Sequence, residues 1–233
     1  MAAAVLAAAV HQDGGKLMQI ATRQFLTPAE QDKISALVRE MEQETSGEIV
    51  PMVVSASHSY PAAMIYGAAI LALAPALLLM PAAGGLFWLG SQNVWIFLPL
   101  FMVFFGLFYH LIARFPRLKR LFLTRRQIDA EVEEAAITAF FTEKLYKTRE
   151  ANGILIFISL LERKVWVLGD SGVNDRINPG QWQGIVALIT AGIKEKRQCE
   201  AICAAVAETG KILKTHFPAR KDDRDELHNL ILR

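Results

Sequence analysis

Residues 62–113 of this chain read AAMIYGAAILALAPALLLMPAAGGLFWLGSQNVWIFLPLFMVFFGLFYHLIA and contain no Asp, Glu, Lys or Arg. The exclusion of charge extends over the whole interval from residue 49 to residue 113. A charged side chain at the centre of a bilayer costs about 2.5–3.5 kcal/mol on the insertion scale, so lipid selects against it. A soluble domain has no comparable reason to exclude charge over so long an interval. The sequence therefore predicts a membrane-embedded segment.

This segment divides into two spans joined by a short link. Residues 62–83 and residues 94–113 each provide about 20 residues of apolar sequence, which is enough to cross a hydrocarbon core. The link, residues 84–93, contains glycines and ends in polar residues, and Trp88 and Trp95 lie where an aromatic belt is expected. Two buried helices of a soluble protein are the alternative, but core helices usually keep a polar face. The pattern favours a transmembrane hairpin.

The flank after the second span is strongly basic. Six cations and no acid occur in residues 114–128: Arg114, Arg117, Lys119, Arg120, Arg125 and Arg126. The positive-inside rule places this flank in the cytoplasm, and a hairpin has both ends on one side, so both soluble parts should be cytoplasmic. We expect its first four cations at anionic lipid headgroups. Nucleic acid is not an expected partner, because the rest of the chain offers no extended basic face.

The part before the hairpin predicts one helix and one strand. Thr27, Pro28 and Glu30 form a capping box with proline at the first helical position, and Gly47 is expected to end the helix. Residues 48–54 (EIVPMVV) are typical of a strand. Because Pro51 lacks a main-chain donor, it favours an edge position or a bulge.

The part after the hairpin predicts a helix, two strands and two further helices. Residues 128–147 form an amphipathic pattern whose apolar face we assign to Ile137, Phe140, Phe141 and Leu145. Residues 153–160 (GILIFISL) are apolar on both faces, as in a central strand covered on two sides, and residues 164–168 (KVWVL) return antiparallel to them. A helix begins after Asn178, and another is expected at residues 198–216.

One strand precedes the hairpin and two follow it. Because an isolated strand is unstable, the first must pair with the later ones, so the hairpin is an insertion within one domain. The predicted fold class is α/β: a small mixed sheet flanked by helices on both faces, with a two-helix transmembrane hairpin inserted after the first strand. The expected segments are an N-terminal extension (1–24), the first part of the domain (25–61), the hairpin (62–113), a basic juxtamembrane segment (114–128), the second part of the domain (129–218) and a charged tail (219–233).

A set of short motifs runs along the two parts of this domain: residues 25–28 (FLTP), 45–50 (TSGEIV), 148–149 (TR), 152–160 (NGILIFISL), 165–170 (VWVLGD), Trp182 and 216–218 (HFP). In combination they resemble the TPM-domain family, also called DUF477, and most of all its bacterial subgroup with a membrane segment after the first strand. The resemblance implies a small sheet with helices on both faces. It also implies a bacterial inner-membrane location. Some soluble relatives act as acid phosphatases, some bind calcium, and plant relatives assist photosystem II repair.

The best candidate for chemistry is the loop after the last predicted strand, residues 169–175 (GDSGVND). Asp170, Asn174 and Asp175 supply the oxygen ligands that Ca²⁺ or Mg²⁺ prefers, at the carboxyl end of a strand. The alternative is an ordinary turn, because Gly, Asp, Ser and Asn are turn residues, and the spacing matches no EF-hand. If the protein is an enzyme, Asp170 and Asp175 are its candidate catalytic residues, with Glu48 as a further acid.

Other nucleophile and metal patterns are weak. Residues 169–172 (GDSG) echo the nucleophile sequence of chymotrypsin-like proteases, with His58 upstream, but the many-stranded barrel pattern is missing. Cys199 and Cys203 stand four residues apart without further ligands nearby in the sequence, which favours reduced, packed thiols. We therefore expect a binding, assembly or quality-control module for a membrane partner, in contact with the lipid bilayer. A metal-assisted acid phosphatase is the alternative, and the oligomeric state stays open.

Overall fold

A computed structural model of the chain describes residues 24–86, 94–219 and 227–233. Trp88 and nearly all of the predicted N-terminal extension lie outside these residues. The chain divides into two compact units, each described by itself: residues 59–128 form one, and the sheet unit combines the described residues up to His58 with residues 129–233.

The sheet unit is built on four strands in the order β3-β2-β1-β4. Its strands are β1 (Glu48–Val54), β2 (Gly153–Ser159), β3 (Lys164–Gly169) and β4 (Ile231–Leu232). β1 pairs in parallel with β2 along its whole length, and β3 pairs antiparallel with β2. The predicted mixed sheet is confirmed, and so is the insertion of two apolar helices after the first strand.

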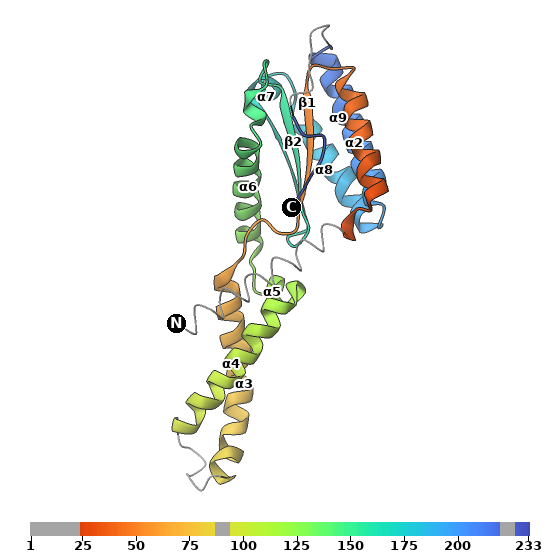
Figure 1. The fold of residues 1–233 in the computed structure, drawn as a ribbon. Coiled ribbons are helices and arrows are strands. Elements are labelled where there is room, and N and C mark those ends of the chain that lie inside the picture. Colours follow the sequence, from red (N-terminus) through yellow and green to blue (C-terminus); the bar gives the residue numbers. More distant parts are fainter. Residues whose placement is uncertain (1–23, 87–93, 220–226) are drawn as a thin grey trace. The chain divides into compact units, whose positions relative to one another are not determined.

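Helices cover both faces of this sheet (Figure 1). One face packs against α2 (Pro28–Glu42), α8 (Pro179–Lys194) and α9 (Gln198–His216), and the core there includes Ile49, Val53, Ile154 and Ile156. The opposite face, with Met52 and Phe157, meets α6 (Arg125–Thr142). Every residue of β1 and of β2 is buried, which explains why the sequence of β2 is apolar on both faces.

The start of α2 is the predicted capping box. Thr27 Oγ1 accepts a hydrogen bond from the Glu30 amide, and the Glu30 carboxylate accepts one from the Thr27 amide at 2.7 Å. The predicted role of Gly47 at the other end is wrong, because α2 ends at Glu42. A Cβ at Gly47 would lie 2.8 Å from the side chain of Leu213, so this glycine allows β1 to approach α9 closely.

The apolar face of α6 differs from the predicted one. Val132, Ala136 and Phe140 are buried against the sheet, whereas the side chains of Ile137 and Phe141 are 39% and 58% exposed. The helix also ends at Thr142 rather than running to residue 147. Lys144 then adopts a left-handed conformation (φ 63°), and a short 3₁₀ turn, η1 (Leu145–Lys147), follows.

β4 lies in the charged tail, where the sequence analysis assigned no strand. It pairs in parallel with β1 through Met52↔Ile231 and Val53↔Leu232, so the predicted edge position of β1 is wrong for these residues. At Pro51 itself, the reason for that prediction, the missing main-chain donor, agrees with the structure. Main-chain groups alternate along a strand, and the Val53 carbonyl faces β4, so the missing donor of Pro51 points to the same side, before β4 begins.

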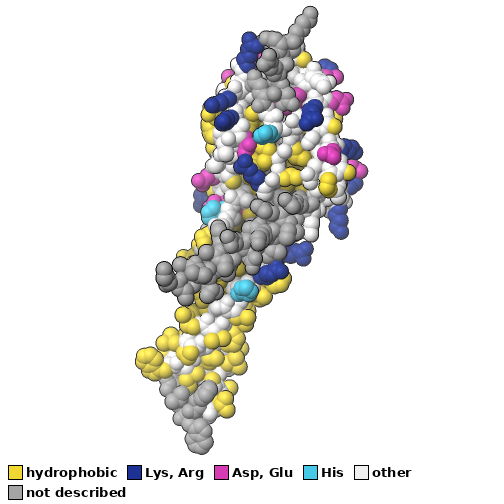
Figure 2. All heavy atoms as spheres, in the orientation of Figure 1, with side chains coloured by type: hydrophobic (Ala, Val, Ile, Leu, Met, Phe, Trp, Pro, Cys, Tyr) yellow, Lys and Arg dark blue, Asp and Glu magenta, His cyan; other side chains and the backbone are white. Residues whose placement is uncertain are grey.

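The hairpin unit contains α3 (Pro61–Leu86), α4 (Val94–Arg114) and the short α5 (Pro116–Leu121). α3 and α4 are long and apolar enough to cross a membrane, and only 28% and 11% of their most apolar windows are buried. A core helix of a soluble protein would be mostly buried. Three small residues at four-residue spacing, Ala68, Ala72 and Ala76, are fully buried and let α3 pack closely. Figure 2 shows hydrophobic side chains gathered over this hairpin.

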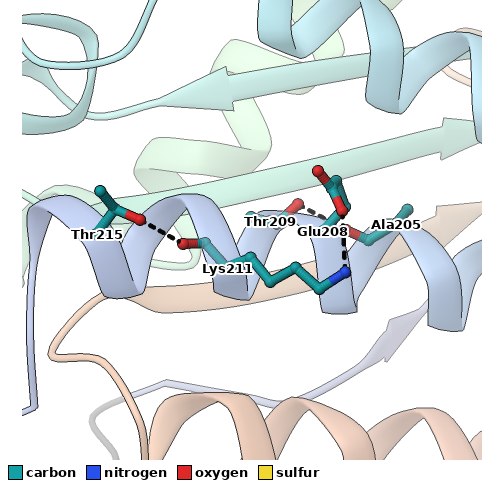
Figure 3. A network of polar contacts seen from close by, with 5 residues as sticks. All are labelled: Ala205, Glu208, Thr209, Lys211 and Thr215. Carbon is teal, nitrogen blue, oxygen red and sulfur yellow. Dashed lines mark hydrogen bonds and ion pairs between the residues drawn. The ribbon is translucent and has the colours of Figure 1, made fainter.

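The hydroxyl groups of two threonines in α9 donate hydrogen bonds to main-chain carbonyls of the same helix (Figure 3). Thr209 is fully buried, and its hydroxyl donates to the Ala205 carbonyl at 2.8 Å; Thr215 bonds to Lys211 in the same way at 3.0 Å. Such i to i−4 bonds allow a polar side chain to enter an apolar core, because no polar hydrogen is left unpaired.

Candidate functional site

The loop of residues 169–175 forms a capped helical turn, α7 (Ser171–Asn174). Asp170 is its N-cap, and Oδ1 of this residue accepts a 2.6 Å hydrogen bond from the Ser171 amide. Asn174 Nδ2 donates to the Gly169 carbonyl at 2.7 Å, while Asp175 is an exposed C-cap. Two of the three predicted ligands therefore also hold the turn together.

Among the described residues, Oδ2 of Asp170 and Oδ1 of Asn152 are buried at this end of the sheet without a hydrogen-bond partner. Asn152 is 1% exposed, and its Nδ2 donates to the Ser46 carbonyl at 2.5 Å. The two residues belong to neighbouring strand ends, because the Asp170 amide donates to the Gly153 carbonyl at 2.9 Å. A buried acceptor without a donor is costly, so these oxygens favour a donor or a hard cation.

Gly172 brings further oxygens to the same loop. A Cβ there would lie 2.6 Å from the Glu150 carbonyl oxygen and 2.9 Å from that of Ala151, so only glycine fits. Ser46 Oγ donates to the Glu150 carboxylate at 3.0 Å. Ser46 and Asn152 were not predicted as site residues, although the Asn152-Gly153 pair at the start of β2 is a turn signal that can mark a special position.

The predicted metal site and its Ca²⁺ or Mg²⁺ stay predictions. Among the residues that the structure describes, no group of three or more His, Cys, Asp or Glu side chains is arranged to hold a metal ion. Asp170 and Asn174 lie at the two ends of α7, and Glu48 is buried at the start of β1. A cation here would need carbonyl and carboxamide oxygens in addition to the carboxylate of Asp170.

An open groove lies between β3 and α8. It has a volume of about 690 Å³ and is mainly apolar, with Val165, Trp166 and Val167 on the strand side. The helix side includes Trp182, Val186, Ala187 and Ala191, and the polar residues of the lining are Gln183, Thr190, Lys194 and Glu195. The volume lies within the roughly 300–1,000 Å³ of ligand pockets, so the groove can accept apolar side chains.

β3 is the outermost strand beside this groove. The Asp170 amide points to β2, and main-chain groups alternate, so those of Val165, Val167 and Gly169 point away from the sheet. The Gly169 carbonyl is occupied by Asn174 Nδ2. In the described part of the chain, the amides and carbonyls of Val165 and Val167 make no hydrogen bond. Four main-chain groups are therefore open at this edge.

A second, smaller pocket of about 370 Å³ lies between the exit of β1 and α6. His58 Nδ1 lies 4.0 Å from Glu131 Oε2 there. The neighbouring amide of Ser57 donates to Glu162 Oε1 at 3.1 Å, and Glu162 is fully buried. His58 thus faces an acid in the sheet unit, three residues before α3 begins.

The predicted membrane-interface residues have different environments. Arg114 ends α4 and is exposed, as is Arg117, and Trp95 is 79% exposed. Arg120 is half-buried. Lys119 is buried, and its Nζ donates to the Ser59 carbonyl at 3.0 Å. Lys119 therefore has a partner within the hairpin unit, and Trp88 lies outside the described residues.

The cysteines of α9 are free thiols. Cys199 is buried and Cys203 is half-buried. Burial, and secondarily Cys199, raises the pKa of the Cys203 thiol to about 11. A thiol with so high a pKa is a poor nucleophile at neutral pH, as expected for packed cysteines.

Comparisons with known proteins agree with this fold. The model of the TPM domain matches residues 120–212. Among solved structures, the chain is similar to the NMR structure of the BA42 protein from the psychrophilic bacterium Bizionia argentinensis. The identity is 19%, the TM-score is 0.54, and the match covers 90% of this chain and 96% of that one. No curated protein matches the chain. The TPM-domain resemblance is thereby confirmed, and the membrane-inserted subgroup stays a prediction.

Proposed function

Because this chain carries a TPM domain, we propose that it is a membrane-anchored TPM protein that binds a membrane partner for assembly or quality control, without chemistry of its own. We further propose that it resides in the bacterial inner membrane and that both soluble parts face the cytoplasm. The basic flank after α4 supports this orientation through the positive-inside rule.

The observation that carries the proposal is the parallel pairing of β1 and β2 around the hairpin. Glu48 pairs with Gly153 at one end and Val54 with Ser159 at the other, although α3 and α4 lie between these strands in the chain. The anchor is thus part of the domain's own topology, because the strands before and after it in the chain belong to one sheet. A domain built in this way is held at the bilayer permanently.

Binding is supported by the groove between β3 and α8. Its lining is mostly apolar, and the adjacent strand offers unpaired main-chain groups. Exposed apolar surface of this kind is typical of interaction sites.

Membrane extraction and reporter fusions test the anchor and its orientation. We expect the full chain to remain in the membrane fraction at alkaline pH. A reporter fused after Arg233 should be active only in the cytoplasm, and one inserted at Gly90 only on the opposite side. Release of the chain at alkaline pH, or a periplasmic report from Arg233, would overturn the proposal.

A metal-assisted acid phosphatase is the second candidate, and the unpartnered Asp170 Oδ2 and Asn152 Oδ1 are the observation in its favour. Hydrolysis of an aryl phosphate by detergent-purified protein, with and without Ca²⁺ or Mg²⁺, distinguishes the two. Metal-dependent turnover that Asp170→Asn abolishes and Asp129→Asn leaves unchanged would establish the enzyme, because Asp129 lies outside the loop and pairs with Lys164. Equal rates of phosphate hydrolysis for wild type and Asp170→Asn would exclude this enzyme and favour the binding module.

A further inference from the structure

We propose that the β3 edge binds an extended segment of the partner protein as an additional strand, with alternate apolar side chains of that segment in the groove beside α8. This inference rests on the proposed function, because it names the surface by which the module holds its partner. The occupant is a polypeptide in extended conformation that carries an acidic group near one end.

The main-chain groups of β3 select an extended polypeptide. The amide and carbonyl of Val165 and of Val167 point away from β2 and are unpaired within the described residues, whereas the Gly169 carbonyl is bonded to Asn174. A strand added at this edge would pair with these two residues and make up to four main-chain hydrogen bonds. Strand addition of this kind provides affinity through the main chain and specificity through side-chain pockets.

The groove selects the side chains of that segment. Successive side chains of a strand point to opposite faces, so every second residue of an added strand would point toward α8. There it would meet Trp182, Val186 and Ala191, which line the groove. The expected pattern is therefore an apolar residue at every second position.

The charges of the groove lining indicate which charge the occupant carries. Glu195 is ion-paired with Arg197, and Lys164 at the start of β3 is paired with Asp129 at 2.6 Å. Lys194 lines the groove, is exposed and makes no ion pair within the described residues. The remaining charge of the lining is thus positive, and a carboxylate on the occupant can pair with Lys194.

The experiment uses the full chain in detergent micelles and a fluorescein-labelled hexapeptide with the sequence DTVTVT, in which the Asp and both Val side chains lie on the same face of a strand. Fluorescence anisotropy measures binding, and amide hydrogen exchange locates it. Two further peptides carry methyl groups on the amide nitrogens of either the odd or the even residues. Ala191→Phe fills the groove, and Leu188→Phe adds the same ring to α8 outside the groove lining.

We expect the hexapeptide to bind and to slow exchange at the amides of Val165 and Val167. Only one of the two methylated peptides should bind, because a strand presents alternate amides to its neighbour. Ala191→Phe should weaken binding at least tenfold, and Leu188→Phe should not change it. Lys194→Glu should weaken binding of DTVTVT and strengthen binding of KTVTVT.

Three results would overturn the inference. No binding of the hexapeptide to folded protein would exclude strand addition of this pattern. Equal binding of both methylated peptides would show a simple apolar pocket. Slow exchange at Val165 and Val167 without peptide, together with a doubled mass in light scattering, would show that the edge pairs with a second copy. Membrane extraction and the reporter fusions do not depend on the groove, so the anchor can be confirmed even if the peptide fails.

Discussion

Lys119 Nζ donates a hydrogen bond of 3.0 Å to the carbonyl oxygen of Ser59, and the lysine is buried within the hairpin unit. The bond joins α5 to the residues that lead into α3. Tyr60, which follows Ser59, is also buried and adopts a positive φ of 50°. The basic end of the hairpin is thus closed by a specific contact and does not depend on lipid alone.

Replacing this lysine should loosen the end of the hairpin. Lys119→Met keeps the length of the side chain but removes the donor, and a hydrogen bond to a charged group contributes about 1.5–3 kcal/mol. We expect faster hydrogen exchange in α5 and in the first turn of α3. Arg117→Met is the matched control, because Arg117 is exposed on the same helix. Equal exchange in both variants would show that the Lys119 bond contributes nothing.

Gly67 should not tolerate a side chain, whereas Gly106 should. A Cβ at Gly67 would lie 2.7 Å from the ring of Phe122, while a Cβ at Gly106 would have no atom within 4 Å. Gly67→Ala should therefore destabilise the hairpin by about 1–3 kcal/mol through overpacking. Gly106→Ala should be neutral or slightly stabilising. Thermal unfolding in micelles compares the two, and an identical loss in both variants would contradict the proposed contact.

The elements that sequence reasoning predicted well are those with a strong local signal. Thr27 and Glu30 identify the start of α2 because the capping box is contained within four residues. The exclusion of charge identifies α3 and α4, and the double-sided apolar run identifies β2. In each case the physical cause acts on neighbouring residues and is visible in the sequence.

The features that were missed depend on contacts between distant residues. β4 has only two residues in a charged tail, and it exists because Val53 offers a free edge. On α6, Ala136 lies on the buried face, whereas Phe141 is exposed although its side chain has the larger apolar surface. In the candidate site, Asn152 meets Ser46 across more than one hundred residues, so no local pattern could reveal its unpartnered oxygen.

Cys203 should react slowly with alkylating reagents. Burial raises the pKa of its thiol from 9.0 to about 11, so the thiolate is roughly a hundredfold scarcer than for a free cysteine. The neutral thiol predominates below this pKa, so the rate should keep rising by about tenfold per pH unit until the pH approaches 11, whereas that of a free cysteine levels off near its lower pKa. Iodoacetamide labelling of Cys199→Ser, in which Cys203 is the remaining cysteine, measures the part of this effect that comes from burial, because Cys199 contributes the rest. The same variant in urea is the control, and equal rates at pH 8 would refute the expectation.

Glu162 should hold the exit of β1 in place. Its carboxylate is fully buried and accepts hydrogen bonds from the Ser57 amide and from the hydroxyl of Ser159. Glu162→Ala removes the acceptor of both donors; for the buried Ser159 hydroxyl this costs about 1–3 kcal/mol, and for the half-buried Ser57 amide less. Since 1 kcal/mol corresponds to about 2–4 °C in a protein of this size, the melting temperature should fall by several degrees.

Two further variants show whether the hydrogen bonds are the cause. Glu162→Gln keeps one acceptor, so its melting temperature should lie between those of wild type and Glu162→Ala. Glu133→Ala removes an exposed acid of α6 and should leave the melting temperature unchanged. If Glu162→Gln is as unstable as Glu162→Ala, the negative charge and not the number of acceptors stabilises this corner. The exchange rate of the Ser57 amide then separates local loosening from global unfolding, because only local loosening accelerates Ser57 without changing β2.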